Sequence, residues 1–274
     1  MLLRWSRGSR QVARLAGADL ATIAAALAAG RPARRRVRRA PADPVETAPM
    51  RDEPVLLVHG FATSAARTWR DNGWIDLLGD AGRQVIAPDL LGHGDAPKPH
   101  EPEAYAGLEG GVAEVLPDRP VDAIGFSLGA RVVLTLAAAD PDRFARIVVA
   151  GVGANLFRSG ESDAIAQAIE GGADAANPVA QYFAGLAAQP GADRRALAAC
   201  IRNPRPPLNA ETLGRVTCPV LVVLGDRDFA GPADPLVEAL PDATFQPLRG
   251  VDHFATPKDF GFIDAALGFL DAQP

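Results

Sequence analysis

The segment that most constrains this chain is residues 125–129, GFSLG, which stands where an apolar run meets a helical pattern. Residues 121–126 indicate a buried strand, and the residues from Leu128 onward indicate a helix. A serine flanked by glycines in such a strand-turn-helix context is typical of a nucleophile elbow, a strained turn that exposes the serine hydroxyl. The alternative is a glycine-rich turn with an incidental serine. The partners found elsewhere in the chain favour Ser127 as a nucleophile.

A serine hydroxyl needs a base to act as a nucleophile near neutral pH. With a nucleophile elbow, the acid and then the histidine follow the serine in chain order. The chain has four histidines, His59, His93, His100 and His253, and only His253 follows Ser127. His253 is therefore the candidate base, although a lone histidine is otherwise more often structural.

An acid is needed to hold the tautomer of that base and to stabilise its charged form. A second apolar run, residues 219–224, indicates a buried strand that leads into Gly225 and then Asp226 and Asp228. Because the two carboxylates should point in different directions, only one is expected to reach His253. The residues alone leave the choice open, and the other aspartate is expected to stabilise the turn.

The oxyanion formed during acyl transfer needs backbone N–H donors. Residues 54–58 indicate a strand that runs into His59 and Gly60, where the chain can turn sharply. The amide after Gly60 and the amide of Leu128 are the two expected donors. His59 itself is expected to be a structural turn residue.

Together these segments resemble the α/β-hydrolase superfamily, in particular serine esterases and lipases with a small cap insertion. The resemblance covers about residues 53–274, and its matching segments are residues 59–61, 87–94, 125–129, 225–228 and 252–254. It implies a catalytic triad of Ser127, Asp228 and His253 and an oxyanion hole formed by the amides of Phe61 and Leu128. Relatives with an aspartate nucleophile, such as epoxide hydrolases and haloalkane dehalogenases, are disfavoured because position 127 is serine.

Apolar runs and helical patterns alternate along the chain, which predicts an α/β fold with a mostly parallel central sheet and helices on both faces. The expected strands are residues 54–59, 84–88, 121–126, 146–151, 219–224 and 243–248. The expected helices between them are residues 64–81, 103–115, 128–139, 232–240 and 258–270. The candidate site residues all follow strands, so they should meet at the carboxyl edge of the sheet.

The domain prediction is a basic arm over residues 1–40, a linker over residues 41–52 and one α/β-hydrolase domain over residues 53–274. An alanine-rich stretch, about residues 152–216, matches the position of the cap insertion of the family. Phe157, Tyr182 and Phe183 in this stretch are candidates for an apolar acyl pocket, with core packing as the alternative. No charged pocket is expected, and apolar or small neutral acyl groups are favoured.

Charge is distributed unevenly over the 274 residues. Residues 1–40 hold ten arginines and one aspartate, so the arm carries +9; since the whole chain carries −5, residues 41–274 carry −14. The acidic body argues against nucleic acid as the main partner. A cytoplasmic location is predicted, with secretion or weak contact of the basic arm with a membrane surface as the alternative.

The sequence therefore predicts a serine hydrolase that cleaves a carboxylic ester or related small acyl compound through an acyl-enzyme intermediate. No cofactor and no metal are expected: the two cysteines, Cys200 and Cys218, define no framework, and no zinc-ligand spacing or phosphate loop is present. The alternatives are a carbon–carbon bond hydrolase, an acyltransferase or a cofactor-free perhydrolase with the same triad. A non-catalytic binding protein of the same fold is a further alternative.

Overall fold

The computed structural model describes residues 52–159, 162–172, 177–203 and 205–273. The predicted arm and all of the predicted linker except Asp52 lie outside these residues. None of the helices in the described ranges is both long and apolar enough to span a bilayer.

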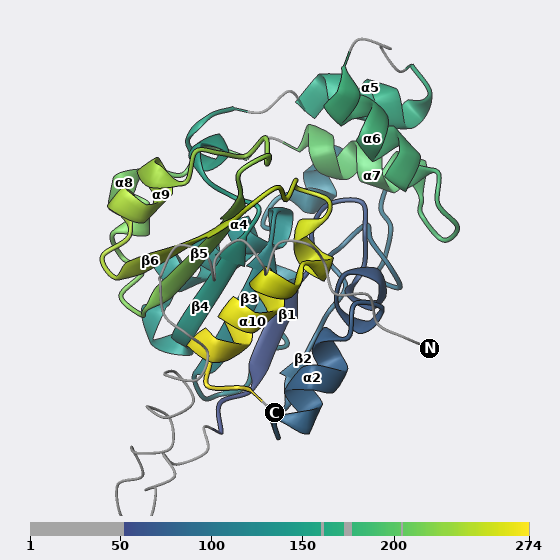
Figure 1. The fold of residues 1–274 in the computed structure, drawn as a ribbon. Helices are drawn as coiled ribbons and strands as arrows, with labels where there is room; N and C mark the ends of the chain where they lie inside the picture. The colour runs from purple at the N-terminus through teal and green to yellow at the C-terminus, as the bar shows by residue number, and fades with distance from the viewer. Residues whose placement is uncertain (1–51, 160–161, 173–176, 204, 274) are drawn as a thin grey trace, which may run out of the picture. The chain divides into compact units, whose positions relative to one another are not determined.

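The described chain forms a central sheet of six parallel strands in the order β2-β1-β3-β4-β5-β6 (Figure 1). The strands are β1 (Val55–Val58), β2 (Val85–Ile86), β3 (Val121–Phe126), β4 (Phe144–Ala150), β5 (Val220–Gly225) and β6 (Ala243–Leu248). Each predicted strand is present, so the predicted fold class is confirmed. The order reverses between β1 and β3, which makes their carboxyl ends the switch point where open α/β sheets bind ligands.

Alternate strand residues enter two separate cores, as the two-residue repeat of a strand requires. In β1, Leu56 and Val58 join the core beneath helix α4 (Leu128–Ala139), whereas Val55 and Leu57 join the core beneath α10 (Phe260–Phe269). The two faces are buried equally well, because both β1 pairs are fully inaccessible to solvent. Helices on both faces explain why the strands read as continuous apolar runs.

The remaining helices that accompany the sheet are short. They are η2 (Ala66–Arg70), α2 (Trp74–Asp80), η3 (Pro102–Tyr105), α3 (Gly110–Ala113), η4 (Pro141–Arg143), α9 (Asp234–Ala239) and η6 (Thr256–Lys258). The single helix predicted over residues 64–81 was wrong, because Gly73 adopts a left-handed conformation (φ 80°) and separates η2 from α2. The pattern over residues 103–115 is likewise divided between η3 and α3.

Between β4 and β5 the chain forms a helical segment with little contact to the sheet. It contains η5 (Ala154–Phe157), α5 (Ser162–Glu170), α6 (Pro178–Ala187), α7 (Arg194–Arg202) and α8 (Ala210–Leu213). Helix α5 packs on α6 and α7, and Figure 1 shows these three helices grouped beyond the carboxyl ends of the strands. The segment therefore stands on the side of the sheet where the candidate site residues were expected.

The opposite end of the sheet holds a buried ionic cluster. Asp122, the second residue of β3, accepts hydrogen bonds from Arg83 Nη2 at 2.5 Å and from Arg146 Nη2 at 3.2 Å. The two guanidinium groups also donate to the Leu270 carbonyl at 2.9 and 2.6 Å. This cluster ties β3 and β4 to the turn that follows α10.

Candidate active site

Ser127 stands at the strained turn between β3 and α4. Its φ of 53° lies in the left-handed region, which is costly for a residue with a side chain, and its amide donates to the Ala150 carbonyl at 2.9 Å. A Cβ atom at Gly129 would clash with the Val58 carbonyl, and one at Gly125 would lie 2.6 Å from the Ala130 Cα. Only glycine fits at either position, so the turn can bring α4 tightly against β1 and β3.

His253 and Asp228 meet Ser127 at the carboxyl edge of the sheet. The distance between His253 Nε2 and Ser127 Oγ is 3.0 Å, and His253 Nδ1 lies 3.0 Å from each carboxylate oxygen of Asp228. A carboxylate only accepts, so Nδ1 carries the proton and Nε2 presents a lone pair to the serine hydroxyl. The Asp228 side chain is fully buried, and its Oδ1 also accepts from the Ala230 amide at 2.8 Å.

The structure separates the two aspartates that the sequence left open. Asp226 Oδ1 accepts from the Gly250 amide at 2.8 Å and so holds the turn that precedes His253. Asp228 is the one placed against the imidazole. Asp226 therefore contributes by fixing the loop that carries the histidine.

Two aromatic rings pack against the imidazole, and the sequence did not reveal them. The His253 ring lies 5.0 Å from the Phe126 ring and 4.3 Å from the Phe229 ring, measured between centroids. A Cβ atom at Gly151 would lie 2.7 Å from the Phe126 ring and 3.1 Å from His253 Cε1. Close packing thus leaves the imidazole little freedom to rotate away from Ser127.

The backbone after β1 is fixed by His59, as expected of a structural turn residue. The Leu90 amide donates to His59 Nε2 at 3.0 Å, so Nδ1 is protonated and donates to the Gly60 carbonyl at 2.8 Å. That carbonyl belongs to the same peptide as the Phe61 N–H, which therefore points the opposite way. The Phe61 amide forms no hydrogen bond with another described residue.

The second expected donor is in place at the start of α4. Leu128 is the first residue of the helix, and the first amides of a helix have no acceptor within it. Ser127 immediately precedes it. The Leu128 amide therefore lies beside Ser127, and Phe61 lines the same cavity as the serine.

Two buried histidines near Phe61 are kept neutral. Burial lowers the pKa of His59, and it lowers the pKa of His93 to about 3, with the neighbouring His59 adding to the shift in His93. The ring centroids of His93 and Phe61 lie 5.5 Å apart. His93 therefore acts as packing behind the turn.

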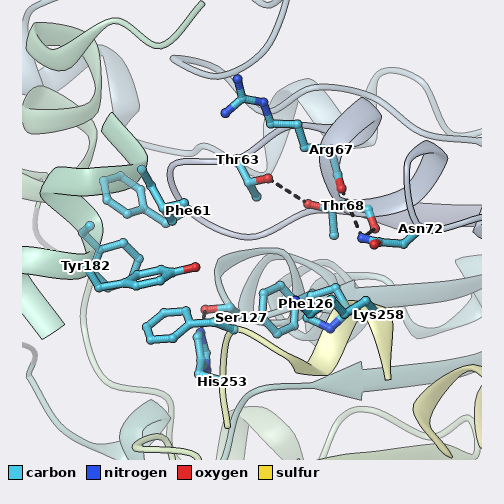
Figure 2. A pocket seen from close by; sticks show the side chains of 14 residues that line it. Phe61, Thr63, Arg67, Thr68, Asn72, Phe126, Ser127, Tyr182, His253 and Lys258 are labelled. Atoms are coloured by element: carbon cyan, nitrogen blue, oxygen red, sulfur yellow. Dashed lines mark hydrogen bonds between the residues drawn. The ribbon is translucent and has the colours of Figure 1, made fainter. Parts of the chain in front are cut away.

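A cavity of about 130 Å³ opens above Ser127 and His253 (Figure 2). Its lining includes the apolar and aromatic side chains of Phe61, Phe126, Tyr182, Phe183, Leu186 and Phe254. It also includes the polar side chains of Thr63, Arg67, Thr68, Asn72 and Lys258. Contrary to the sequence-based expectation of an uncharged pocket, two cations line it.

Two of the three predicted pocket residues lie at this cavity. Tyr182 and Phe183 come from α6, and Figure 2 shows the Tyr182 hydroxyl pointing into the space near Ser127. Burial raises the pKa of Tyr182, so the phenol stays protonated and can donate a hydrogen bond. Phe157 instead packs against the main core from η5 and does not line this cavity.

No group of three or more His, Cys, Asp or Glu side chains in the described ranges is placed to hold a metal ion. The polar groups that do converge are the serine, the imidazole and the carboxylate, with the Leu128 amide directly after the serine. This arrangement can transfer a proton from the serine hydroxyl and hold a charged oxygen beside it.

Comparison with known proteins gives the same fold. A family model described as "Alpha/beta hydrolase family" matches residues 55–263. A haloalkane dehalogenase of Mycolicibacterium paratuberculosis is 28% identical over 249 residues, which cover 77% of this chain and 80% of that protein. A 2-hydroxy-6-oxo-2,4-heptadienoate hydrolase of Pseudomonas putida is 31% identical over 119 residues, 41% of this chain and 42% of that protein.

The solved structure of a bromoperoxidase from Bacillus anthracis superimposes with a TM-score of 0.63. The superposition covers 81% of this chain and 92% of that chain at 24% identity. A likeness at that identity supports the fold and leaves the reaction to be argued from the site.

Proposed function

The chain belongs to the alpha/beta hydrolase family, and from this premise we propose that it is a serine hydrolase that cleaves a carboxylic ester or related acyl compound. The observation that carries the proposal is the continuous hydrogen-bonded line from Ser127 Oγ through His253 to Asp228, with 3.0 Å at each step. These distances are within reach for proton transfer between a nucleophile and its base.

The reaction follows from the roles that these atoms can take. Ser127 Oγ attacks the acyl carbon while its proton moves to His253 Nε2, and Asp228 stabilises the resulting imidazolium. The amides of Phe61 and Leu128 donate to the oxyanion, a contribution worth about 3–4 kcal/mol per donor in comparable sites. The tetrahedral intermediate then expels the alcohol, which takes the proton from His253. The acyl group remains bound to Ser127 Oγ as an ester.

The second half of the reaction repeats these roles with water. The oxygen of a water molecule attacks the acyl carbon while His253 accepts a proton from that water. The amides of Phe61 and Leu128 donate to the second oxyanion. The proton then returns to Ser127 Oγ as the carboxylic acid leaves. No further reactant is needed, so the described residues account for a complete cycle.

Cleavage of a carbon–halogen bond is disfavoured by the nucleophile. A serine that displaced halide from an alkyl carbon would form an ether, and an ether offers no carbonyl for a His253-activated water to attack. The cycle would stop at the alkylated serine. The similarity to a haloalkane dehalogenase therefore supports the family and not that reaction for this chain.

Carbon–carbon bond hydrolysis is the second candidate. The similarity to a 2-hydroxy-6-oxo-2,4-heptadienoate hydrolase favours it, since that name denotes an acidic substrate and two cations, Arg67 and Lys258, line this cavity. The triad would serve either reaction. A substrate panel separates the three reactions. Neutral esters test ester hydrolysis, acyl donors with an added alcohol test acyl transfer, and vinylogous 1,5-diketo acids test carbon–carbon cleavage.

The decisive experiment is labelling with a fluorophosphonate probe together with turnover of p-nitrophenyl esters. The wild-type protein is expected to be labelled and active, and Ser127→Ala is expected to lose both properties while retaining its fold. Ser64→Ala is the matched control, because Ser64 Oγ only accepts from the Arg67 amide at 3.2 Å. Full activity in Ser127→Ala, or an unlabelled wild-type protein, would contradict the proposal.

A further inference from the structure

A second, larger cavity lies on the α4 side of the fold, separate from the cavity at Ser127. Its volume is about 560 Å³, which is within the range of small-molecule sites. Three parts of the chain enclose it: the loop from η3 to α3, the outer side of α4, and the residues around 205–212 that lead into α8. No residue of the Ser127 cavity is shared with it.

Two arginines line this cavity. Arg131 projects from α4 and Arg205 from the segment after α7, and both are half-buried. Glu109 is the only carboxylate among the described residues that line it. The cavity therefore carries a net positive charge.

Neither arginine forms an ion pair with a carboxylate of the described chain. Arg131 Nη2 donates to the Pro206 carbonyl, and Arg205 Nη2 donates to the carbonyl and the sulfur of Cys200 at 3.0 and 3.2 Å. A guanidinium has five N–H donors, so these contacts orient the two groups and leave most of their donors for another partner. Planar guanidinium groups suit phosphate oxygens in particular.

The electrostatic setting makes this pair unusual. Burial lowers the pKa of Arg131, and the nearby Arg205 lowers it further, whereas Glu109 opposes the change. Two like charges are thus held together partly out of water, at a cost that an anion between them would offset. The two arginines do not belong to a generally basic part of the chain, because residues 41–274 carry a net charge of −14.

We propose that this cavity is a binding site for a small phosphorylated molecule, with Arg131 and Arg205 holding its phosphate. A phosphate monoester carries close to two negative charges at pH 7, which matches the two guanidinium groups. The remaining volume accommodates the organic part of the ligand, and Thr135 and Asn209 line it with a hydroxyl and an amide. The site does not depend on the reaction at Ser127.

The test is isothermal titration of the full-length protein with glycerol 3-phosphate, inorganic phosphate and glycerol at constant ionic strength. Saturable binding of glycerol 3-phosphate at one site per chain is expected, and glycerol is expected not to bind. Weaker binding of inorganic phosphate would show that the organic part adds contacts. Equal binding would still support a phosphate site, with no recognition of the organic part.

Single substitutions locate the site. Arg131→Gln and Arg205→Gln should each weaken glycerol 3-phosphate binding about tenfold or more, since each removes a charge-assisted contact. Arg215→Gln is the matched control, because Arg215 is an exposed residue of the same region that pairs with Glu211 at 3.2 Å. Circular dichroism of each variant establishes that it is folded. If one of the two arginine variants does not fold, weakened binding in the other is enough to locate the site.

Two results would overturn the proposal. One is the absence of saturable binding by the wild-type protein. The other is equal weakening in Arg215→Gln and in the two cavity variants, which would show that the phosphate responds to overall charge and not to this cavity.

Discussion

Two aspartates with fully buried side chains stand at opposite ends of the central sheet and have very different partners. Asp122, at the amino end, is bound by the guanidinium groups of Arg83 and Arg146, which can only donate hydrogen bonds. Asp228, at the carboxyl end, is bound to the imidazole of His253, whose second nitrogen can accept a hydrogen bond from Ser127. The two aspartate side chains are equally buried, and their partners differ in whether they can also accept a proton.

The two ends also differ in what surrounds each carboxylate. The arginines at the amino end use their other donors on the carbonyls of Glu53, Phe269 and Leu270, so that cluster consists of fixed contacts. At the carboxyl end the chain of contacts ends at Ser127, a strained residue beside an open cavity. The amino end of the sheet therefore stabilises the fold, whereas the carboxyl end leaves the Ser127 hydroxyl at a cavity where it can react.

The largest expected effect at the carboxyl end is that of Asp228→Asn on catalysis. The amide can donate to the imidazole and favour the wrong tautomer, so kcat is expected to fall about 10⁴-fold, as it does in established serine triads. The free energy of unfolding should change far less. Steady-state kinetics with p-nitrophenyl esters and urea unfolding measure the two effects.

Asp226→Asn is the matched control for that substitution. Asp226 lies two residues away and accepts from the Gly250 amide, which an asparagine oxygen can also do. Its kcat is expected to stay within a few-fold of wild type. Equal losses in the two variants would mean that Asp228 has no role distinct from holding the loop.

The opposite substitution, Asp122→Asn, should affect stability and leave the chemistry alone. It removes the carboxylate that pairs with the buried Arg83 and leaves Arg146 only its pair with the exposed Asp271 at 3.0 Å, and such a loss typically costs about 3–5 kcal/mol of unfolding free energy. The kcat of the protein that remains folded, corrected by active-site titration, should be unchanged. Asp52→Asn, which removes the exposed pair with Arg119, is the control and should change stability little.

The sequence predicted the carboxyl end of the sheet much better than the amino end. Site residues there follow strands at short, patterned spacings, and the resemblance to a known superfamily distinguished Asp228 from Asp226. The roles of Ser127, Asp228 and His253 remain predictions that the substitutions above test. Their meeting point follows from a parallel sheet, because the carboxyl ends of its strands share one edge.

No local pattern marks the cluster at the amino end. Asp122 lies inside an apolar run, and its partners are 39 residues earlier and 24 residues later in the chain. Periodicity reports which face of an element a residue occupies and not which distant residue it meets. The rings of Phe126 and Phe229 that pack against His253 were missed for the same reason.

Acid should distinguish the two ends of the sheet. The pKa of His93 is about 3 in the folded protein, so between pH 6.5 and 3 the unfolded chain binds more protons at this residue and stability falls as the pH falls. The slope is up to about 1.4 kcal/mol per pH unit. This loss of stability originates at the carboxyl end, where the His93 ring lies beside Phe61.

His93→Asn should reduce this acid sensitivity. The asparagine amide can replace Nδ1 as the donor to the Leu91 carbonyl, which lies 2.9 Å from Nδ1. Urea unfolding at pH 7.5, 6 and 5 is expected to show a smaller loss of stability in the variant than in wild type, whatever its stability at pH 7.5. Identical slopes would show that His93 does not govern the acid response.

The smallest expected effect concerns the packing that orients His253. Phe229 lies against the imidazole but does not line the cavity, so Phe229→Ala should lower kcat about threefold to tenfold with little change in KM. Phe229→Tyr keeps the ring and should restore kcat, whereas Phe260→Ala, at a ring that is 86% exposed, should have no effect. A rise in KM without a fall in kcat would indicate that Phe229 contacts the substrate. In that case the orientation of the His253 imidazole would depend on Phe126 and on the hydrogen bonds to Asp228, and not on Phe229.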